Sequence, residues 1–162
     1  MNKFNLPFFG QIKLPFRPEY LSSLFYKGVN MDVVLYLDAK DIESNMFSKV
    51  DMFLREFASW EAKARSSLLQ DFLDGGETYH HLAWYLKIIK GEHPDDYVHV
   101  NLDDGHEAVS NFYLKTVSIF LEKEEKTSQI VFDYSVNTKI LDHIMVVYFY
   151  LDGSILRICE ES

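Results

Sequence analysis

The last third of the chain, residues 130–158, constrains the fold more than any other stretch. It holds three strand-like runs, IVFDYSV, HIMVVYFYL and SILRIC, and an Asp152-Gly153 pair separates the last two. Asp-Gly between two apolar runs predicts a β-hairpin with a type I′ turn, because that turn needs positive φ angles at both central residues. We therefore expect three antiparallel strands in this part of the chain.

A two-residue turn at Asp152-Gly153 also predicts the register of the hairpin. The expected pairs are Leu151–Ser154, Tyr150–Ile155, Phe149–Leu156, Tyr148–Arg157 and Val147–Ile158. Because side chains alternate across a sheet, one face is predicted to be wholly apolar and to carry Val147, Phe149, Leu151, Leu156 and Ile158. The opposite face is predicted to carry Val146, Tyr148, Tyr150, Ile155, Arg157 and Cys159.

Length and composition predict one domain with a substantial core, spanning residues 1–162. Nearly half of the residues (48%) are hydrophobic, which is typical of a globular protein and not of a disordered one. No apolar run approaches the ~20 residues that a helical membrane span needs, so we expect no membrane partner. The single cysteine, Cys159, excludes an internal disulfide and favours a reducing compartment, which predicts a cytoplasmic location.

The chain is acidic, with 16 basic and 25 acidic residues and a formal charge of −9. Such a charge repels phosphate backbones, which argues against nucleic-acid binding and favours a basic protein as partner. The alternative interpretation is that the charge serves solubility alone.

The first forty residues contain further strand signals. Residues 4–16 are broken by Pro7 and Pro15, which predicts an edge strand or an arm that docks on the body of the protein. The side chains expected to dock are Phe8, Phe9, Ile12 and Leu14. A second hairpin is expected where residues 24–26 lead through Lys27-Gly28 into residues 29–37, with one apolar face made of Val29, Met31, Val33, Leu35 and Leu37.

The pattern becomes helical from Ser44, the expected N-cap, to a stop at Gly75-Gly76. Thirty residues is long for one globular helix, so a kink is expected near residues 58–60. A second helix is predicted from Thr78 to about Lys90, with Leu82, Tyr85, Leu86 and Ile89 facing inward. A strand is then expected from Phe112 to Glu122.

This order of elements predicts an α+β fold in two layers. One layer is an antiparallel sheet formed by the N-terminal hairpin and the C-terminal meander. The other is a pair of helices packed on one face, for which the aliphatic face of the meander is the obvious place.

Residues 91–107, GEHPDDYVHVNLDDGHE, carry six acidic residues and three histidines but no lysine or arginine. A calcium loop fails here, because aligning Gly105 with its glycine puts Val100 and Leu102 where oxygen ligands are needed. His80 and His81 are adjacent on a helix and cannot easily face one metal. We interpret the segment as a solvated loop, with a short helix beginning near Glu107.

A search for catalytic patterns finds no nucleophile elbow and no phosphate-binding loop. We therefore assign no catalytic residue, no metal ligand and no cofactor. The alternative hypothesis is a metal-dependent hydrolase that uses loop 91–107 together with His80 or His81.

The outer face of the meander is the candidate binding surface. Tyrosine and arginine are enriched in protein interfaces, because they give a large contact area at low entropic cost. We expect the partner-binding residues to be Tyr148, Tyr150, Arg157, Asp133 and Phe120, with Tyr148 opposite Arg157 at the centre. The alternatives are that the N-terminal strands or an arm cover this face, or that it is an ordinary sheet surface.

Four segments also resemble a known family. They are the Phe9-Gly10 opening, the FDYSV strand, the VVYFYLDGSI hairpin and the ending at Glu160, Glu161 and Ser162. They resemble a family of small acidic bacterial proteins catalogued as a domain of unknown function, and the resemblance implies no activity or catalytic residue. Small acidic α+β proteins are also similar in fold and charge to immunity proteins, which neutralise a cognate toxin.

The leading hypothesis is therefore a non-enzymatic, cytoplasmic bacterial protein that binds a basic protein partner, in the manner of an immunity protein. A homodimer joined through the same sheet face is a further hypothesis.

Overall fold

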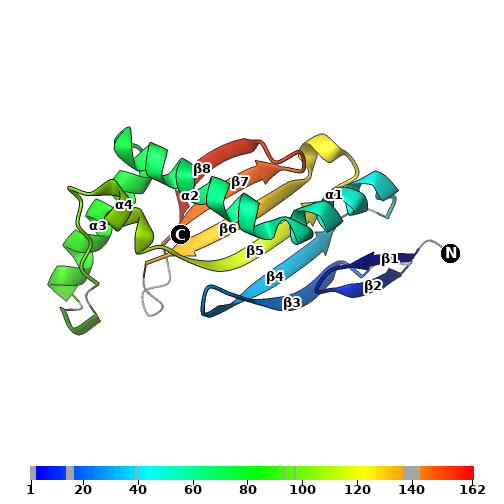
Figure 1. Cartoon of the computed structure of the whole chain (residues 1–162), viewed down its shortest axis with the longest axis horizontal. Helices are drawn as coiled ribbons and strands as arrows, with labels where there is room; N and C mark the ends of the chain where they lie inside the picture. The colour runs from blue at the N-terminus through cyan, green and yellow to red at the C-terminus, as the bar shows by residue number, and fades with distance from the viewer. Residues whose placement is uncertain (1–2, 14–16, 39, 93, 97, 137–142) are drawn as a thin grey trace.

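A six-stranded sheet forms the centre of the protein (Figure 1). The computed structural model describes residues 3–13, 17–38, 40–92, 94–96, 98–136 and 143–162. The strands are β1 (Lys3–Leu6), β2 (Gly10–Lys13), β3 (Glu19–Tyr26), β4 (Val29–Leu37), β5 (Tyr113–Leu121), β6 (Gln129–Ser135), β7 (Ile144–Tyr150) and β8 (Ile155–Glu161). The α-helices are α1 (Ser44–Arg55), α2 (Phe57–Leu73), α3 (Glu77–Glu92) and α4 (Gly105–Ser110). Short 3-10 turns occupy Pro94–Asp96 and Glu125–Thr127.

The strands follow one another across the sheet in chain order, from β3 at one edge to β8 at the other. All pairs are antiparallel except β4 with β5, which run parallel. The connection between those two strands contains all four α-helices, which is the kind of long crossover that a parallel pair requires. The predicted two-layer α+β fold is confirmed. The parallel junction was not foreseen, because it depends on the path of this crossover and on no turn signal.

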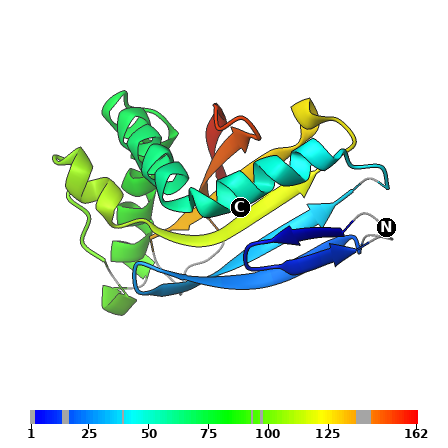
Figure 2. The ribbon, with the colours of Figure 1, turned by 45° about the vertical axis from the view of Figure 1, so that its right-hand side comes forward.

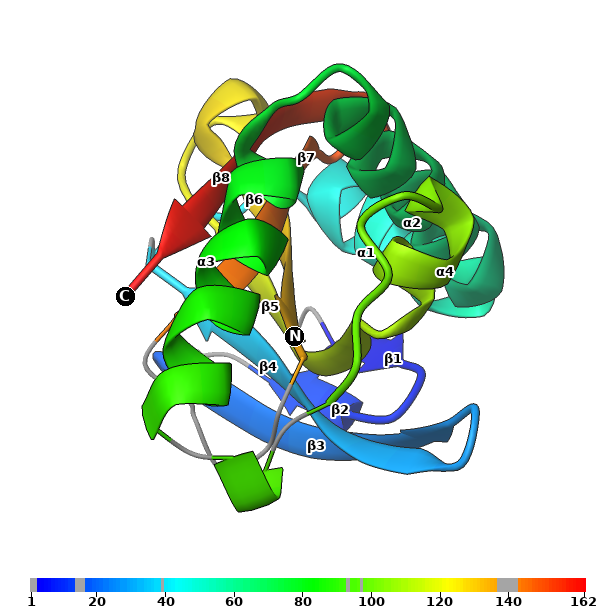
Figure 3. The same cartoon turned by 90° about the vertical axis from the view of Figure 1, so that its left-hand side faces the viewer.

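Helices α1 and α2 lie over one face of the sheet (Figures 1 and 3). Their aromatic side chains pack on the face predicted to be dry. The Phe53 and Phe57 rings lie 6.0 and 5.7 Å from that of Phe132 on β6, and Trp60 lies 5.2 Å from Phe149 on β7. Val147 is also fully buried. The prediction that the helices cover the aliphatic face of the meander is therefore confirmed.

The β1–β2 hairpin lies on the same side of the sheet, beside α1 (Figure 2). Phe4 stacks on Phe47 of α1 with ring centroids 4.1 Å apart. Phe9 and Ile12 dock on the core as expected. Phe8 does not, because it occupies the hairpin turn at φ +68° and is 46% exposed. Leu14 lies outside the described residues.

The long helical stretch is two helices rather than one kinked helix. The break is at Glu56 (φ −100°, ψ 18°), two residues before the predicted position. The N-cap of α1 is Glu43 and not Ser44, which is the first helical residue. Gly75 (φ +71°) follows the end of α2 as predicted, and α3 buries Leu82, Tyr85 and Ile89 on its inner side.

The turn of the closing hairpin differs from the predicted type I′ turn. Gly153 has a φ of +83°, but Asp152 is not among the described residues with positive φ. The Gly153 amide donates to the Tyr150 carbonyl and the Tyr150 amide donates to the Ser154 carbonyl, both at 3.0 Å. These bonds close a three-residue loop in which glycine occupies the left-handed position. Tyr150 therefore lies opposite Ser154 instead of Ile155.

A bulge in β8 restores the predicted register farther from the turn. Phe149 pairs with Ile155, and the register then shifts by one so that Tyr148 pairs with Arg157 and Val147 with Ile158. The extra residue is Leu156, which was predicted to face Phe149. Ile155 consequently packs against the core, although it was predicted on the outer face.

Two phenylalanines on opposite faces of the sheet test this assignment of faces. Phe132→Ala should cost about 3–5 kcal/mol of unfolding free energy, because it opens a cavity beneath α1 and α2. Phe120→Ala, on the uncovered face and 38% exposed, should cost about 1 kcal/mol or less. Urea unfolding of both variants measures the difference. Equal losses would contradict the proposed burial.

Candidate functional site

The face of the sheet opposite α1 and α2 presents rows of side chains that cross all or most of its strands. The register places one row in the order Leu21, Val34, Ser118, Val131, Tyr148 and Arg157. A flanking row contains Glu19, Tyr36, Phe120, Gln129 and Tyr150. The other flanking row contains Ser23, Asp32, Thr116, Asp133, Val146 and Cys159. We call this surface the open face.

The centre of the candidate site is a contact among Tyr148, Arg157 and Glu161. The guanidinium carbon of Arg157 lies 4.2 Å from the centroid of the Tyr148 ring, a cation–π distance. The Tyr148 hydroxyl donates to Glu161, and an Arg157 nitrogen lies 3.7 Å from the same carboxylate. The pairing of Tyr148 with Arg157 was predicted from the sequence. Glu161 was missed, although the alternation Arg157, Cys159, Glu161 places it on this face.

Asp133 is a partly buried carboxyl group on the same face. Burial and, to a lesser extent, the negative charge of Glu161 raise its pKa from 3.8 to about 6, against the opposing effect of Lys115. Within the described part of the chain, no side chain donates a hydrogen bond to the Asp133 carboxylate. The group is therefore poised to exchange its proton between weakly acidic and neutral pH.

A groove of about 430 Å³ joins these residues between β5 and β8. Four of the five predicted binding residues line it: Phe120, Asp133, Tyr148 and Arg157. Tyr150 lies in the row that contains Phe120 but does not line the groove. The Phe120 ring is stacked on Tyr36, with centroids 4.8 Å apart, which supports one wall of the groove. The lining combines two aromatic rings with the carboxyl groups of Glu122, Asp133 and Glu161, which outnumber Arg157 and suit a cationic ligand group.

The pKa of Asp133 generates a pH-dependent stability difference. Its folded-state pKa lies above the ordinary carboxyl value, so the folded protein holds this proton more tightly than the unfolded chain. The contribution of Asp133 to stability therefore falls as the pH rises from about 4 to 6. Asp133→Asn should raise the unfolding free energy by about 1–2 kcal/mol at neutral pH and by little near pH 3, where the carboxyl group is mostly protonated in both states.

Thermal or urea unfolding across this pH range measures the effect. The matched control is Asp32→Asn, an exposed carboxylate in the same row of the open face. It should change stability little at any pH. A difference between Asp133→Asn and the native protein that does not grow with pH would contradict the assignment.

The two helix histidines named in the alternative hypothesis, His80 and His81, lie in different surroundings. His80 is exposed, whereas His81 is buried and its Nδ1 lies 3.2 Å from Glu160 Oε2. His143 Nδ1 lies 2.8 Å from the other oxygen of Glu160, so one carboxylate orients two imidazoles. Burial lowers the pKa of His81, and the Glu160 carboxylate opposes that effect.

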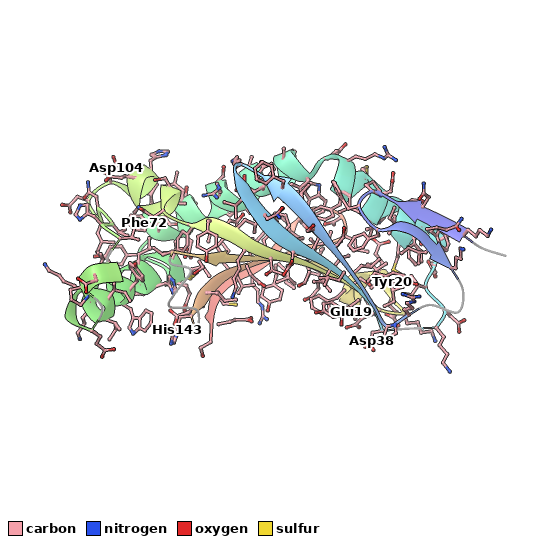
Figure 4. All side chains as sticks on the ribbon, turned by 90° about the horizontal axis from the view of Figure 1, so that it is seen from below. Glu19, Tyr20, Asp38, Phe72, Asp104 and His143 are labelled. Atoms are coloured by element: carbon pink, nitrogen blue, oxygen red, sulfur yellow. The ribbon has the colours of Figure 1, made fainter. Side chains whose placement is uncertain are left out.

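This histidine–glutamate cluster joins α3 to the end of β8 and lies at the α3 end of the molecule, where Figure 4 labels His143. Trp84 of α3 packs against His143 with ring centroids 4.3 Å apart. Sequence reasoning missed the cluster, because Glu160 is 79 positions from His81 and 17 from His143. No local pattern connects residues so distant in the chain.

Within the described part of residues 91–107, polar side chains hydrogen-bond to other groups of the same segment. The Asp104 side chain accepts from the amides of His106 and Glu107 and caps α4, which begins at Gly105 and not near Glu107. Asn101 donates to Glu107 at 3.0 Å. His93 lies outside the described residues. Among the residues that the structure does describe, no three histidine, cysteine or acidic side chains converge to hold a metal ion.

Comparison of the chain with protein-family models, with curated proteins and with solved structures found no match. The resemblance to a family of small acidic bacterial proteins therefore stays a prediction. None of the described helices combines the length and the apolar character needed to cross a membrane.

Proposed function

We propose that the protein binds a basic protein partner through the open face, with the Tyr148–Arg157–Glu161 cluster at the centre of the interface. The observation that carries this proposal is the groove beside that cluster, which adjoins an uncovered sheet surface. Tyrosine and arginine side chains of this kind supply much of the binding energy in protein interfaces.

The charge of the open face supports a basic partner. The face carries the acidic side chains of Glu19, Asp32, Asp133 and Glu161, and Glu122 also lines its groove. Arg157 is already engaged by Glu161. This local excess has the same sign as the net charge of −9. Charge complementarity would raise the association rate with a cationic surface and disfavour acidic competitors.

Exposed apolar side chains on the same face add a hydrophobic contribution. Leu21, Phe25 and Phe120 are 67%, 71% and 38% exposed. Burial of such groups against a partner gives about 25 cal/mol per Å² of apolar surface. A binding role of this kind needs no catalytic group, as in the analogy with immunity proteins.

The proposal is tested by affinity capture from native lysate with three forms of the protein as bait. Tyr148→Ala/Phe120→Ala should lose basic partners that the native protein retains, by roughly 100-fold in affinity if both residues are interface anchors. The control is Met52→Ala/Leu73→Ala, which truncates exposed apolar residues on the helices (50% and 61% exposed).

Any partner should be identified by mass spectrometry and its affinity measured at two salt concentrations. A basic partner should bind less tightly at higher salt, because screening weakens the charge attraction. Equal recovery of every partner by all three baits would remove the open face as the binding surface.

A further inference from the structure

Strand β3 leaves one edge of the sheet unpaired. Among the described strands its only partner is β4. The Leu37 amide donates to the Pro18 carbonyl, so in this antiparallel pair the even-numbered residues of β3 direct their backbone groups toward β4. The backbone groups of the odd-numbered residues therefore point away from the sheet. These residues are Glu19, Leu21, Ser23 and Phe25.

Between positions 20 and 26 this edge lacks the features by which proteins usually block edge-to-edge pairing. Its pairing with β4 runs without a bulge from Glu19 to Tyr26. No charged residue or proline occurs at positions 20–26. The opposite edge, β8, has the Leu156 bulge and three charged side chains, Arg157, Glu160 and Glu161. Natural sheets use bulges and charges of this kind to prevent edge pairing.

The side chains next to the free edge are also unusually exposed for apolar residues. Leu21 and Phe25 are 67% and 71% exposed, the highest fractions among the large apolar side chains in the described part of the chain. Both are odd-numbered residues of β3 and lie on the open face, with Ser23 between them. Unpaired backbone groups and exposed apolar side chains thus coincide at two positions, Leu21 and Phe25.

We propose that a second copy of the chain pairs with this edge, with the two β3 strands antiparallel and centred on Ser23. In this register Leu21 of each copy faces Phe25 of the other, and Ser23 faces Ser23. All of these residues direct their backbone groups outward, so the hydrogen-bonding pattern of an antiparallel pair is satisfied. Leucine–phenylalanine pairs on one face are the cross-strand contacts that stabilise a sheet.

At its ends the register places Glu19 of one copy opposite Lys27 of the other. Lys27 lies in the β3–β4 turn with its ammonium group 3.0 Å from Glu61 of α2, so the seam is formed by residues 21–25. The β1–β2 hairpin does not occupy the edge, because it packs on the core side, where the Ser22 hydroxyl donates to the Phe8 carbonyl at 2.8 Å.

The register is related to itself by a two-fold axis through Ser23, so the assembly closes as a dimer. Its two sheets join into one, and the bulged, charged β8 strands lie at the two outer edges. The open faces of the two copies then form one continuous surface. This inference rests on the β3 edge and is independent of the proposed partner groove.

Light scattering over a dilution series tests the dimer directly. The native protein should approach twice the chain mass of 19.0 kDa as its concentration rises. Leu21→Lys/Phe25→Lys should weaken dimerisation by at least roughly 100-fold, because the register places the new lysines opposite one another. Met52→Lys/Leu73→Lys, which adds the same charge on the helices, should dimerise like the native protein.

A charge-swap experiment tests the register. Leu21→Glu/Phe25→Glu should also be monomeric alone, but its mixture with Leu21→Lys/Phe25→Lys should form a heterodimer with two opposite-charge pairs. Circular dichroism checks that each variant is folded. A native protein that remains at the mass of one chain, a lysine variant that dimerises normally, or a mixture that stays monomeric would each overturn the proposal.

Discussion

The packing of the α1 and α2 aromatics on Phe132 and Phe149 determines the rest of the structure. These contacts bury one face of the sheet, and none of the described helices covers the other, although Val34, Val131 and Val146 are buried there too. The same element order with the helices on the opposite face would have buried Tyr148 and exposed Phe149. The candidate site and the proposed partner surface both follow from which side of the sheet the helices occupy.

The closing hairpin shows how a local irregularity can preserve a functional pairing. The three-residue loop shifts the register by one residue, and the bulge at Leu156 shifts it back, so that Tyr148 and Arg157 still face each other. Two features of the turn require glycine at position 153. The φ of Gly153 is +83°, and a β-carbon there would lie 3.3 Å from Trp60 of α2. The turn is thus fitted to the helix beneath it.

Periodicity was enough to predict most of the elements and the faces they present. The alternation in residues 144–150 and the helical spacing in residues 44–73 correctly placed Val147 and Phe149 in the core. The parallel β4–β5 junction could not be predicted, because it depends on how four helices return the chain to the sheet. The break at Glu56 likewise lacks a glycine or proline to signal it.

The candidate site was predicted only in part, again because alternation within strands can be read from the sequence whereas tertiary contacts cannot. Tyr148, Arg157, Asp133 and Phe120 follow from strand alternation, and the groove brings them together. Extending the alternation from Cys159 to the next residue on the same face would have added Glu161. The cluster of His81, His143 and Glu160 arises from tertiary contact between α3 and the strand ends, so no spacing in the sequence could indicate it.

Hydroxyl-radical footprinting with mass spectrometry tests the central claim, that α1 and α2 cover one face of the sheet and leave the other open. Phe120 and Tyr148 should be modified readily in the native protein, whereas Phe132 and Phe149 should become reactive only on unfolding. Rapid modification of Phe132 and Phe149 together with protection of Phe120 and Tyr148 would contradict the account.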